Sequence, residues 1–268
     1  MTKLLTLNTH SLIEVEYEKK LNILAKALKK YKPNIVALQE VMQPKSAAPI
    51  DHIENFIRCG KIAVKKGNHC INIVNKLNSL GLKYNSVWLG INKAYDLYEE
   101  GLCFLCDNLI DSTDVVNLSS FDDYDNWKTR KALGIKVNNV WYYNVHLGWW
   151  NDEESSSKDE IQRLNNHVNF QEETWLLGDF NSPDNEQNTG YDLLCEGWFD
   201  TYHLAQIKDD GITVEGQIDG WKNKNRKRID YIFTNRKKRV ISTEVIFNGK
   251  KEQIISDHYG ILLNFEEE

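Results

Sequence analysis

Apolar residues recur along the chain at two different spacings, and together these spacings predict a mixed α/β fold. Residues 14–30 carry leucine and alanine at helical spacing and predict an amphipathic helix. A second helix is predicted over residues 68–80, with Gly81 as its C-terminal cap. A third helix is predicted to begin at Ser157, because the spacing from Ser157 to Glu160 matches a capping box.

Shorter apolar runs between these helices predict β-strands. They lie near residues 35–38, 102–106, 133–137, 140–146, 175–178, 230–234, 241–247 and 259–265. No internal repeat or low-complexity linker separates them, so the sequence predicts a single domain over residues 1–268. The segment 42–66 has prolines but no clear period, and it is predicted to be a long loop over the functional site.

Six short polar clusters each stand at one end of an apolar run. They contain Asn8, Gln39 and Glu40, Asn144 and His146, Asp179 and Asn181, Arg228 to Tyr231, and Ser256 to His258. Ionisable groups beside a core are costly to bury unless they are paired or hold a metal. Six such clusters in one chain therefore indicate that the fold gathers them into one site.

The order of strand and cluster predicts how the sheets are built. Asn8, Glu40, His146 and Asp179 follow their strands, whereas Asp230 and the pair Asp257–His258 precede theirs. In an all-parallel sheet these two groups would fall on opposite edges. Antiparallel pairing of the late strands with the early ones would place all of them on one edge. The sequence therefore predicts mixed sheets covered by helices.

Composition is that of an ordinary globular protein, with 41% hydrophobic and 27% charged residues. No run approaches the ~20 apolar residues of a transmembrane helix. The first residues turn polar too early for a secretion signal, so a cytoplasmic location is expected. Cys103 and Cys106 are expected to pack in a strand, because residues three apart on a strand point to opposite faces.

Net charge bears on the class of substrate. A formal charge of −6 disfavours a dedicated duplex-DNA binder, which usually carries a basic face. The densest basic segment is 222–228, which is read either as a solvated loop or as a phosphate contact through Arg228.

The residue types in the six clusters favour metal-dependent phosphoryl chemistry. A hard divalent cation such as Mg²⁺ takes oxygen ligands and needs only one or two protein carboxylates. Glu40 is the first choice of ligand, with Asn8 and Asp257 beside it. Mg²⁺ is the expected cofactor, and Mn²⁺ is expected to substitute for it.

Two further pairs suggest how a proton would be handled. Asp179 and Asn181 are two residues apart around a turn and could share a water, which Asp179 would deprotonate and Asn181 would orient. Asp230 and His258 form a candidate carboxylate–imidazole pair, in which the carboxylate raises the pKa of the imidazole. Either Asp179 or His258 could be the base, and one or two metals could act.

The ordered set of these motifs resembles the endonuclease/exonuclease/phosphatase superfamily, which has the DNase I-like fold. The set comprises Asn8, Gln39-Glu40, Glu100-Gly101-Leu102, His146, Gly178-Asp-Phe-Asn181, Arg228-Ile-Asp-Tyr231 and Ser256-Asp-His258. The resemblance implies a four-layer α/β sandwich, in which two mixed β-sheets pack face to face with helices outside. It also implies a magnesium-dependent hydrolase of phosphate esters. One departure is Cys106-Asp107, where relatives commonly have Ser-Arg.

The resemblance also implies roles for individual residues. Glu40, Asn8 and Asp257 would hold the metal, Asp179 and Asn181 would handle the water, and Asp230–His258 would form the dyad. His146 would touch the phosphoryl group, with Glu100 as its carboxylate partner, and Arg130 would support the substrate phosphate.

Within this superfamily, several long segments are similar to bacterial maltose 6'-phosphate phosphatases, which are cytoplasmic enzymes. The segments are 98–102, 121–131, 146–151, 197–202 and 210–221. The expected reaction is then hydrolysis of maltose 6'-phosphate to maltose and phosphate. Aromatic faces with converging polar groups recognise sugars. Substrate contacts are therefore expected from Trp149, Trp150, Asp219, Trp221 and Arg228.

Two other functions stay open at this point. The first is a magnesium-dependent phosphodiesterase acting on DNA or RNA, which would need basic loops on both sides of the site. The second is a non-catalytic binding protein, although no catalytic position is missing. The expected partner is a small sugar phosphate, with no membrane and no obligate protein partner, and nucleic acid is disfavoured.

Overall fold

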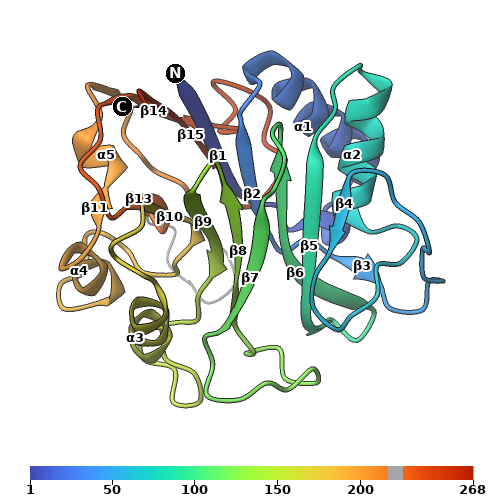
Figure 1. Cartoon of the computed structure of the whole chain (residues 1–268), viewed down its shortest axis with the longest axis horizontal. Coiled ribbons are helices and arrows are strands. Elements are labelled where there is room, and N and C mark those ends of the chain that lie inside the picture. The colour runs from blue at the N-terminus through green and yellow to red at the C-terminus, as the bar shows by residue number, and fades with distance from the viewer. Residues whose placement is uncertain (217–225, 268) are drawn as a thin grey trace.

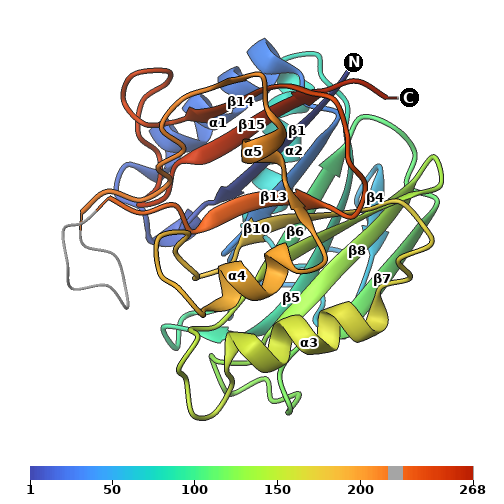
Figure 2. The ribbon, with the colours of Figure 1, turned by 90° about the vertical axis from the view of Figure 1, so that its left-hand side faces the viewer.

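Two mixed β-sheets pack face to face, with helices on their outer sides (Figures 1 and 2). This computed structural model describes residues 1–216 and 226–267. The arrangement is the predicted four-layer α/β sandwich. Three apolar clusters separate its layers, one between the two sheets and one beneath each layer of helices.

The first sheet joins strands from both ends of the chain. In spatial order it contains β12 (Ile207–Lys208), β14 (Val240–Ile246), β15 (Gly260–Phe265), β1 (Thr2–Asn8), β2 (Ile35–Gln39), β6 (Tyr98–Cys106), β5 (Asn85–Ala94) and β4 (Phe56–Arg58), and β3 (Gln43–Pro44) also pairs with β6. β1 runs parallel to β2 and antiparallel to β15. This is the mixed pairing that the order of strands and clusters predicts.

The second sheet comes from the middle of the chain. In spatial order it contains β11 (Phe199–Asp200), β13 (Asp230–Thr234), β10 (Thr174–Asp179), β9 (Val140–His146), β8 (Lys131–Val137) and β7 (Ser112–Asn117). β10 runs parallel to β9 and antiparallel to β13. The late strand β13 therefore begins beside the end of β10.

Helices cover the outer face of each sheet (Figures 1 and 2). On the first sheet they are α1 (Tyr17–Tyr31) and α2 (His69–Ser79), and on the second they are α3 (Ser157–His167) and α4 (Gly190–Cys195). The chain also forms two short helices, η1 (Ser11–Ile13) and α5 (Thr201–Leu204). Leu5 and Leu7 of β1 pack under the first helix layer, whereas Leu4 packs between the sheets. This alternation is the period of two expected for a strand. In the described ranges, no helix combines the length and apolar character needed to span a membrane.

The predicted start of α3 at Ser157 is confirmed, but the predicted capping box is wrong. The side chain of Ser156, not Ser157, accepts a hydrogen bond from the backbone N–H of Asp159 at the start of α3. Glu160 does not complete a capping box; its carboxylate accepts hydrogen bonds from Ser155 and from the backbone of Gly148. Two neighbouring serines made the capping position ambiguous in the sequence.

Two long strands, β5 and β7, were not predicted, and neither were the two-residue strands β11 and β12. The middle of β5 is buried on both faces, so it lacks the alternation of a half-exposed strand. The segment 42–66, predicted to be a long loop over the site, is mostly irregular, but it supplies β4 at one edge of the first sheet and β3 beside β6. Its predicted position over the site is wrong, because parallel pairing of β4 with β5 and antiparallel pairing of β3 with β6 hold the segment along this part of the sheet, and none of its residues lines the cleft at the candidate site.

Candidate active site

The polar clusters of both sheets meet at one edge of the sandwich. Asp179, the last residue of β10, lies in register with Asp230 of β13 on one side and with His146 of β9 on the other. In the first sheet, Asn8 pairs with Gln39, and Glu40 follows directly. Side-chain contacts between Asn8 and Asp179 join the two sheets at this edge.

A cleft of about 560 Å³ opens at this edge. The predicted site residues that line it are Glu40, Glu100, Arg130, His146, Trp149, Asp179, Asn181, Asp257 and His258. Asn8 lies fully buried beneath them and touches two of them. The structure thus brings together residues from both ends of the chain.

The amide of Asn8 links two of the carboxylates. Its Nδ2 donates to Glu40 Oε1 at 2.8 Å and to Asp179 Oδ2 at 3.1 Å. Burial raises the pKa of Glu40 to about 8, with further contributions from Glu100 and Asp257. Negative charge in this cluster is therefore poorly compensated by the protein itself.

This donor set fits a hard divalent cation. Oxygen atoms of Glu40, Asp257 and Asn8 are the ligands that Mg²⁺ or Mn²⁺ prefers. A cation beside Glu40 would offset the burial and the like-charge repulsion that raise its pKa. These three residues are the ones that would hold the cation. Bound there, it would act as a Lewis acid on a phosphoryl oxygen.

His258 and Asp230 form a buried ion pair. His258 Nδ1 lies 3.0 Å from Asp230 Oδ2, and its Nε2 lies 3.7 Å from Asp179 Oδ2. Burial lowers the pKa of His258, but the charges of Asp230 and Asp179 outweigh it and raise the pKa well above the usual value. His258 is therefore an imidazolium at neutral pH.

Asp179 is held in place by the turn that follows β10. The backbone N–H of Asn181 donates to Asp179 Oδ1 at 2.9 Å, and Asn181 adopts a left-handed φ of 48°. Asn181 Nδ2 donates to the carbonyl oxygen of Leu147 at 2.9 Å, so its amide oxygen remains to orient a water. Burial raises the pKa of Asp179 to about 6, which leaves it ionised at neutral pH.

His146 and Arg130 complete the floor of the cleft. His146 lies 3.7 Å from Asp179 Oδ2 and 3.9 Å from Glu100 Oε1. Burial, together with the nearby charges of Arg130 and His258, holds the pKa of His146 well below its usual value, so its imidazole is neutral. The Nε of Arg130 is buried and has no hydrogen-bond partner within the described ranges.

The family to which the chain belongs follows from a comparison of its sequence with known families. A model described as "Endonuclease/Exonuclease/phosphatase family" matches residues 5–258. The chain belongs to this family. Members of the endonuclease/exonuclease/phosphatase family are hydrolases and generally use divalent metals. No curated protein matches the sequence.

Solved structures of the same family share the fold. A family member from Leptotrichia buccalis C-1013-b is 29% identical with a TM-score of 0.89, and each chain is covered completely, at 100%. The mannosyl-6-phosphatase Bt3783 of Bacteroides thetaiotaomicron VPI-5482 is 14% identical with a TM-score of 0.67 and 100% coverage of both chains. An AP endonuclease from Archaeoglobus fulgidus is 16% identical with a TM-score of 0.62, again with 100% coverage of both. The latter two likenesses concern the fold alone.

Two predicted substrate contacts, Arg228 and Trp150, do not line the cleft. Arg228 is only 3% exposed, and its guanidinium lies 2.6 Å from Asp200 Oδ2 and 2.9 Å from Asp184 Oδ2. The expectation that Arg228 contacts phosphate is corrected, because a buried guanidinium paired with two carboxylates is already satisfied. Trp150 also lies outside the cleft lining. Asp219 and Trp221 lie outside the described residues.

Sequence reasoning missed eight of the residues that line the cleft, and Trp127 and His10 are among them. The ring of Trp127 meets that of Trp149 edge to face, with centroids 5.7 Å apart. An ion pair links the loop that carries Trp127 to the loop that carries Trp149, because Lys128 Nζ lies 2.8 Å from Asp152 Oδ2. These two segments are the tryptophan loops. The signal for Trp127 was its place in the segment 121–131, between the cleft residues Asp125 and Arg130.

Proposed function

We propose that this protein is a divalent-metal-dependent phosphomonoesterase acting on a sugar phosphate, with maltose 6'-phosphate as the first candidate. The observation that carries the proposal is a single cleft with ionised catalytic groups at one end and a tryptophan pair at the other. Its volume of about 560 Å³ suits a ligand much larger than a free phosphate.

The two pKa shifts support a division of roles between Asp179 and His258 in this proposal. Asp179 is ionised at neutral pH and accepts the proton of the attacking water, which the Asn181 amide orients. His258 is an imidazolium and neutralises charge on the phosphoryl oxygens. A bond from the water oxygen to phosphorus forms while the ester bond breaks, Asp179 holds the proton of the water, and the departing sugar oxygen takes up a proton from solvent. Groups with pKa values pushed apart are typical of acid–base pairs.

Recognition of the sugar would rest on the tryptophan end of the cleft. Trp127 is 50% exposed and Trp149 is half-buried against it, so together they present aromatic surface to a ligand. Trp149 Nε1 is buried without a hydrogen-bond partner within the described ranges, as Arg130 Nε is. Lys93 and Asp125, 3.1 Å apart on the same wall, offer charged and polar groups for hydroxyls.

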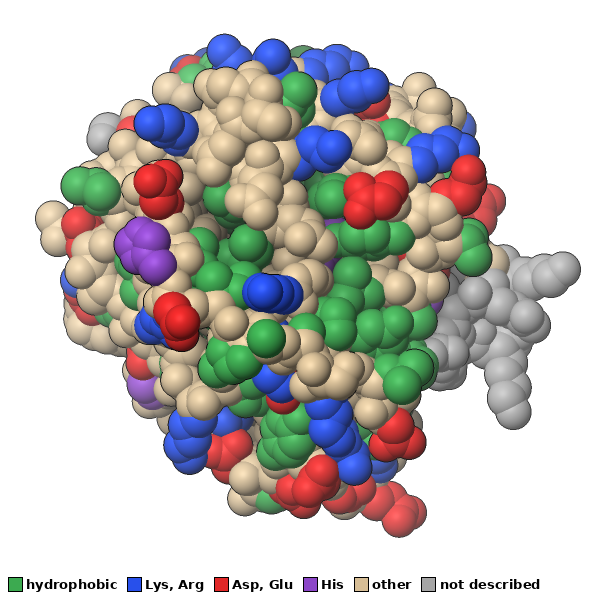
Figure 3. All heavy atoms as spheres, turned by 90° about the vertical axis from the view of Figure 1, so that its right-hand side faces the viewer, with side chains coloured by type: hydrophobic (Ala, Val, Ile, Leu, Met, Phe, Trp, Pro, Cys, Tyr) green, Lys and Arg blue, Asp and Glu red, His purple; other side chains and the backbone are tan. Residues whose placement is uncertain are grey.

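Charge disfavours a nuclease. The described lining of the cleft includes six carboxylates (Glu40, Asp96, Glu100, Asp125, Asp179 and Asp257), but only two Lys or Arg side chains, Lys93 and Arg130. A polyanion would meet repulsion from such a surface. On the face that carries β4 and α2, basic and acidic side chains are interspersed (Figure 3). A small dianionic ester, neutralised by one cation, is better matched to this cleft.

The same proposal includes a cytoplasmic location and no obligate protein partner. A charged sugar phosphate does not cross a membrane unaided, so the proposed substrate would be met inside the cell. Mg²⁺ is the proposed cofactor, with Mn²⁺ as a substitute, because the donors around Glu40 are oxygen atoms.

The test is a substrate comparison with purified protein and Mg²⁺. Phosphate release is measured from maltose 6'-phosphate, glucose 6-phosphate and mannose 6-phosphate, and plasmid DNA is run in parallel. We expect the highest kcat/KM with a sugar phosphate and loss of that activity in Asp179→Asn. Nicking of the plasmid without phosphate release from any sugar would overturn the proposal.

A further inference from the structure

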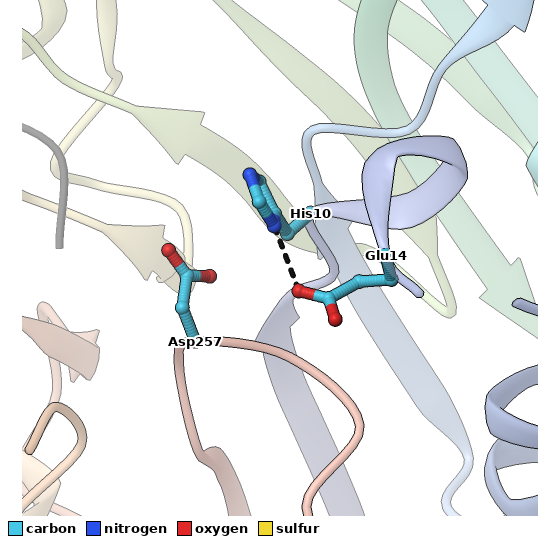
Figure 4. A group of neighbouring side chains, drawn as sticks. All are labelled: His10, Glu14 and Asp257. Carbon is cyan, nitrogen blue, oxygen red and sulfur yellow. Dashed lines mark hydrogen bonds and ion pairs between the residues drawn. The ribbon is translucent and has the colours of Figure 1, made fainter. Parts of the chain in front are cut away.

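A histidine and two carboxylates gather on the side of the cleft next to η1. Ligand atoms of His10, Glu14 and Asp257 all lie within 4.8 Å of one another, and the three side chains point toward a common space (Figure 4). His10 lines the cleft together with Asp257 and Glu40. The cluster is therefore continuous with the cation ligands proposed above.

The backbone places His10 there by several contacts. His10 adopts a left-handed φ of 46°, which is uncommon for a residue with a side chain. Its N–H donates to Asn8 Oδ1 at 3.3 Å, and the next residue, Ser11, donates through Oγ to the carbonyl oxygen of Glu40 at 2.6 Å. The turn that carries His10 is thus fastened to the two residues at the base of the cleft.

The imidazole is oriented by Glu14. His10 Nδ1 lies 2.7 Å from Glu14 Oε1, and Glu14 is itself ion-paired with Lys20. The other ring nitrogen points away from Glu14 (Figure 4), and no hydrogen bond to it occurs within the described ranges. In the neutral imidazole, an Nδ1–H that donates to the Glu14 carboxylate leaves Nε2 with its lone pair available, and a cation bound there takes the place of the Nε2 proton. This is the usual arrangement of a histidine that binds a metal.

We infer that His10 is a direct ligand of the divalent cation at Glu40 and Asp257, and that Glu14 is its positioning residue. This inference rests on the proposed function, because it concerns the cation of that same site. Lys20 balances the charge of Glu14, which leaves Glu14 suited to orient the imidazole and Asp257 to face the cation. The site then has a nitrogen donor among its oxygen ligands.

A nitrogen ligand changes which cation the site prefers. Mg²⁺ takes oxygen ligands almost exclusively, whereas first-row transition-metal ions, Mn²⁺ among them, also accept imidazole nitrogen beside oxygen ligands. The protein is therefore expected to bind Mn²⁺ more tightly than Mg²⁺. Replacing His10 by a residue with an oxygen donor should reduce the difference between the affinities for Mn²⁺ and Mg²⁺.

The test uses Mn²⁺ as both probe and ligand. Electron spin-echo spectroscopy of the Mn²⁺-loaded protein detects a directly bound imidazole through its ¹⁴N modulation. We expect the modulation in the unmodified protein and in the control His146→Gln, and its loss in His10→Gln. Titration calorimetry should show Mn²⁺ affinity falling roughly 10- to 100-fold in Glu14→Gln, which keeps the ligand, and further in His10→Gln, which removes it.

Each alternative result is informative. Mn²⁺ binding without ¹⁴N modulation, or modulation that persists in His10→Gln, would overturn the role of His10 while leaving the phosphatase proposal intact. No Mn²⁺ or Mg²⁺ binding by the unmodified protein would overturn both. In His10→Asp, an unchanged ratio of Mn²⁺ to Mg²⁺ affinity would also contradict the inference. Circular dichroism of each variant establishes that the fold is retained.

Discussion

The two ends of the cleft are built in different ways. At the reaction end, Asp179 and Asp230 are each only 1% exposed and lie in register on neighbouring strands. At the tryptophan end, Trp127 is 50% exposed and stands on a loop fastened by side-chain ion pairs. Sheet register fixes the first geometry, whereas surface contacts fix the second. If the tryptophans bind the sugar as proposed, changes to their loops would alter substrate preference in this protein without disturbing the catalytic groups.

The largest effect is expected from removing charge at the reaction end. Glu40→Gln keeps the size of the side chain and an acceptor for Asn8 Nδ2 but removes the carboxylate that would hold the cation. We expect kcat to fall about 10³-fold or more with any phosphate monoester, equivalent to about 4 kcal/mol of transition-state stabilisation. The measurement is steady-state phosphate release from maltose 6'-phosphate and from p-nitrophenyl phosphate.

A neighbouring acid supplies the control. Glu99 precedes Glu100 on β6 but does not line the cleft. Its Oε2 lies 2.8 Å from Lys65 Nζ. Glu99→Gln should retain most turnover per folded molecule. Near-normal turnover in Glu40→Gln would mean that the strand-end cluster is not the reaction site.

The second prediction concerns the link between α3 and the Trp149 loop. Glu160 is fully buried and accepts hydrogen bonds from the backbone of Gly148 at 2.7 Å and from Ser155 Oγ at 2.6 Å. Burial raises the pKa of Glu160 from 4.5 to about 7, against the opposing charge of Arg130. Between these two values the folded protein keeps a proton that the unfolded chain has released. The free energy of unfolding should therefore fall as pH rises from 4.5 to 7.

The size of this change is at most about 3.5 kcal/mol, because each pH unit contributes about 1.4 kcal/mol. Glu160→Gln keeps an acceptor for Gly148 and cannot ionise, so this component of the pH dependence should vanish. Urea denaturation of both proteins between pH 4.5 and 8 measures the difference. Parallel stability curves would show that Glu160 does not titrate in this range.

The contrast between the two ends also explains what the sequence could predict. Asn8, Glu40, Asp179 and Asp230 were found because each follows or precedes an apolar run, and strand order alone brings such positions to one edge. The position of Trp127 at the cleft was not predicted, because it depends on the path of a loop. Hydrophobic periodicity carries no information about that path.

The error at Arg228 has a related cause. Its neighbours in sequence point to the active site, but its partners Asp184 and Asp200 are distant along the chain. A pattern of residue types cannot show which of several acidic side chains will form an ion pair with a given guanidinium. Similarly, β5 was missed because burial on both faces removes the alternation that marks a strand.

The third prediction tests the tryptophan end directly. Trp127→Ala removes exposed aromatic surface without touching the catalytic groups. We expect KM for maltose 6'-phosphate to rise roughly 10-fold, because aromatic burial against a sugar is lost, while kcat with p-nitrophenyl phosphate stays unchanged. Trp141→Ala is the matched control, since Trp141 stacks on Tyr143 outside the cleft. An unchanged KM in Trp127→Ala would place the sugar elsewhere.

The smallest effect is expected from the ion pairs that hold the tryptophan loops together. Lys128 Nζ lies 2.8 Å from Asp152 and 3.4 Å from Glu154, and it also sits 5.7 Å from the centre of the Trp127 ring. Partly exposed pairs of this kind contribute about 0.2–1 kcal/mol, so Lys128→Ala should raise KM for the sugar phosphate only about 2- to 5-fold. The difference should shrink in high salt, which screens the pairs in the unmodified protein, and Lys128→Arg should restore the lower KM. A large loss of kcat would instead mean that the tryptophan loops affect the catalytic groups at the strand ends. The two parts of the cleft would then not be independent of each other.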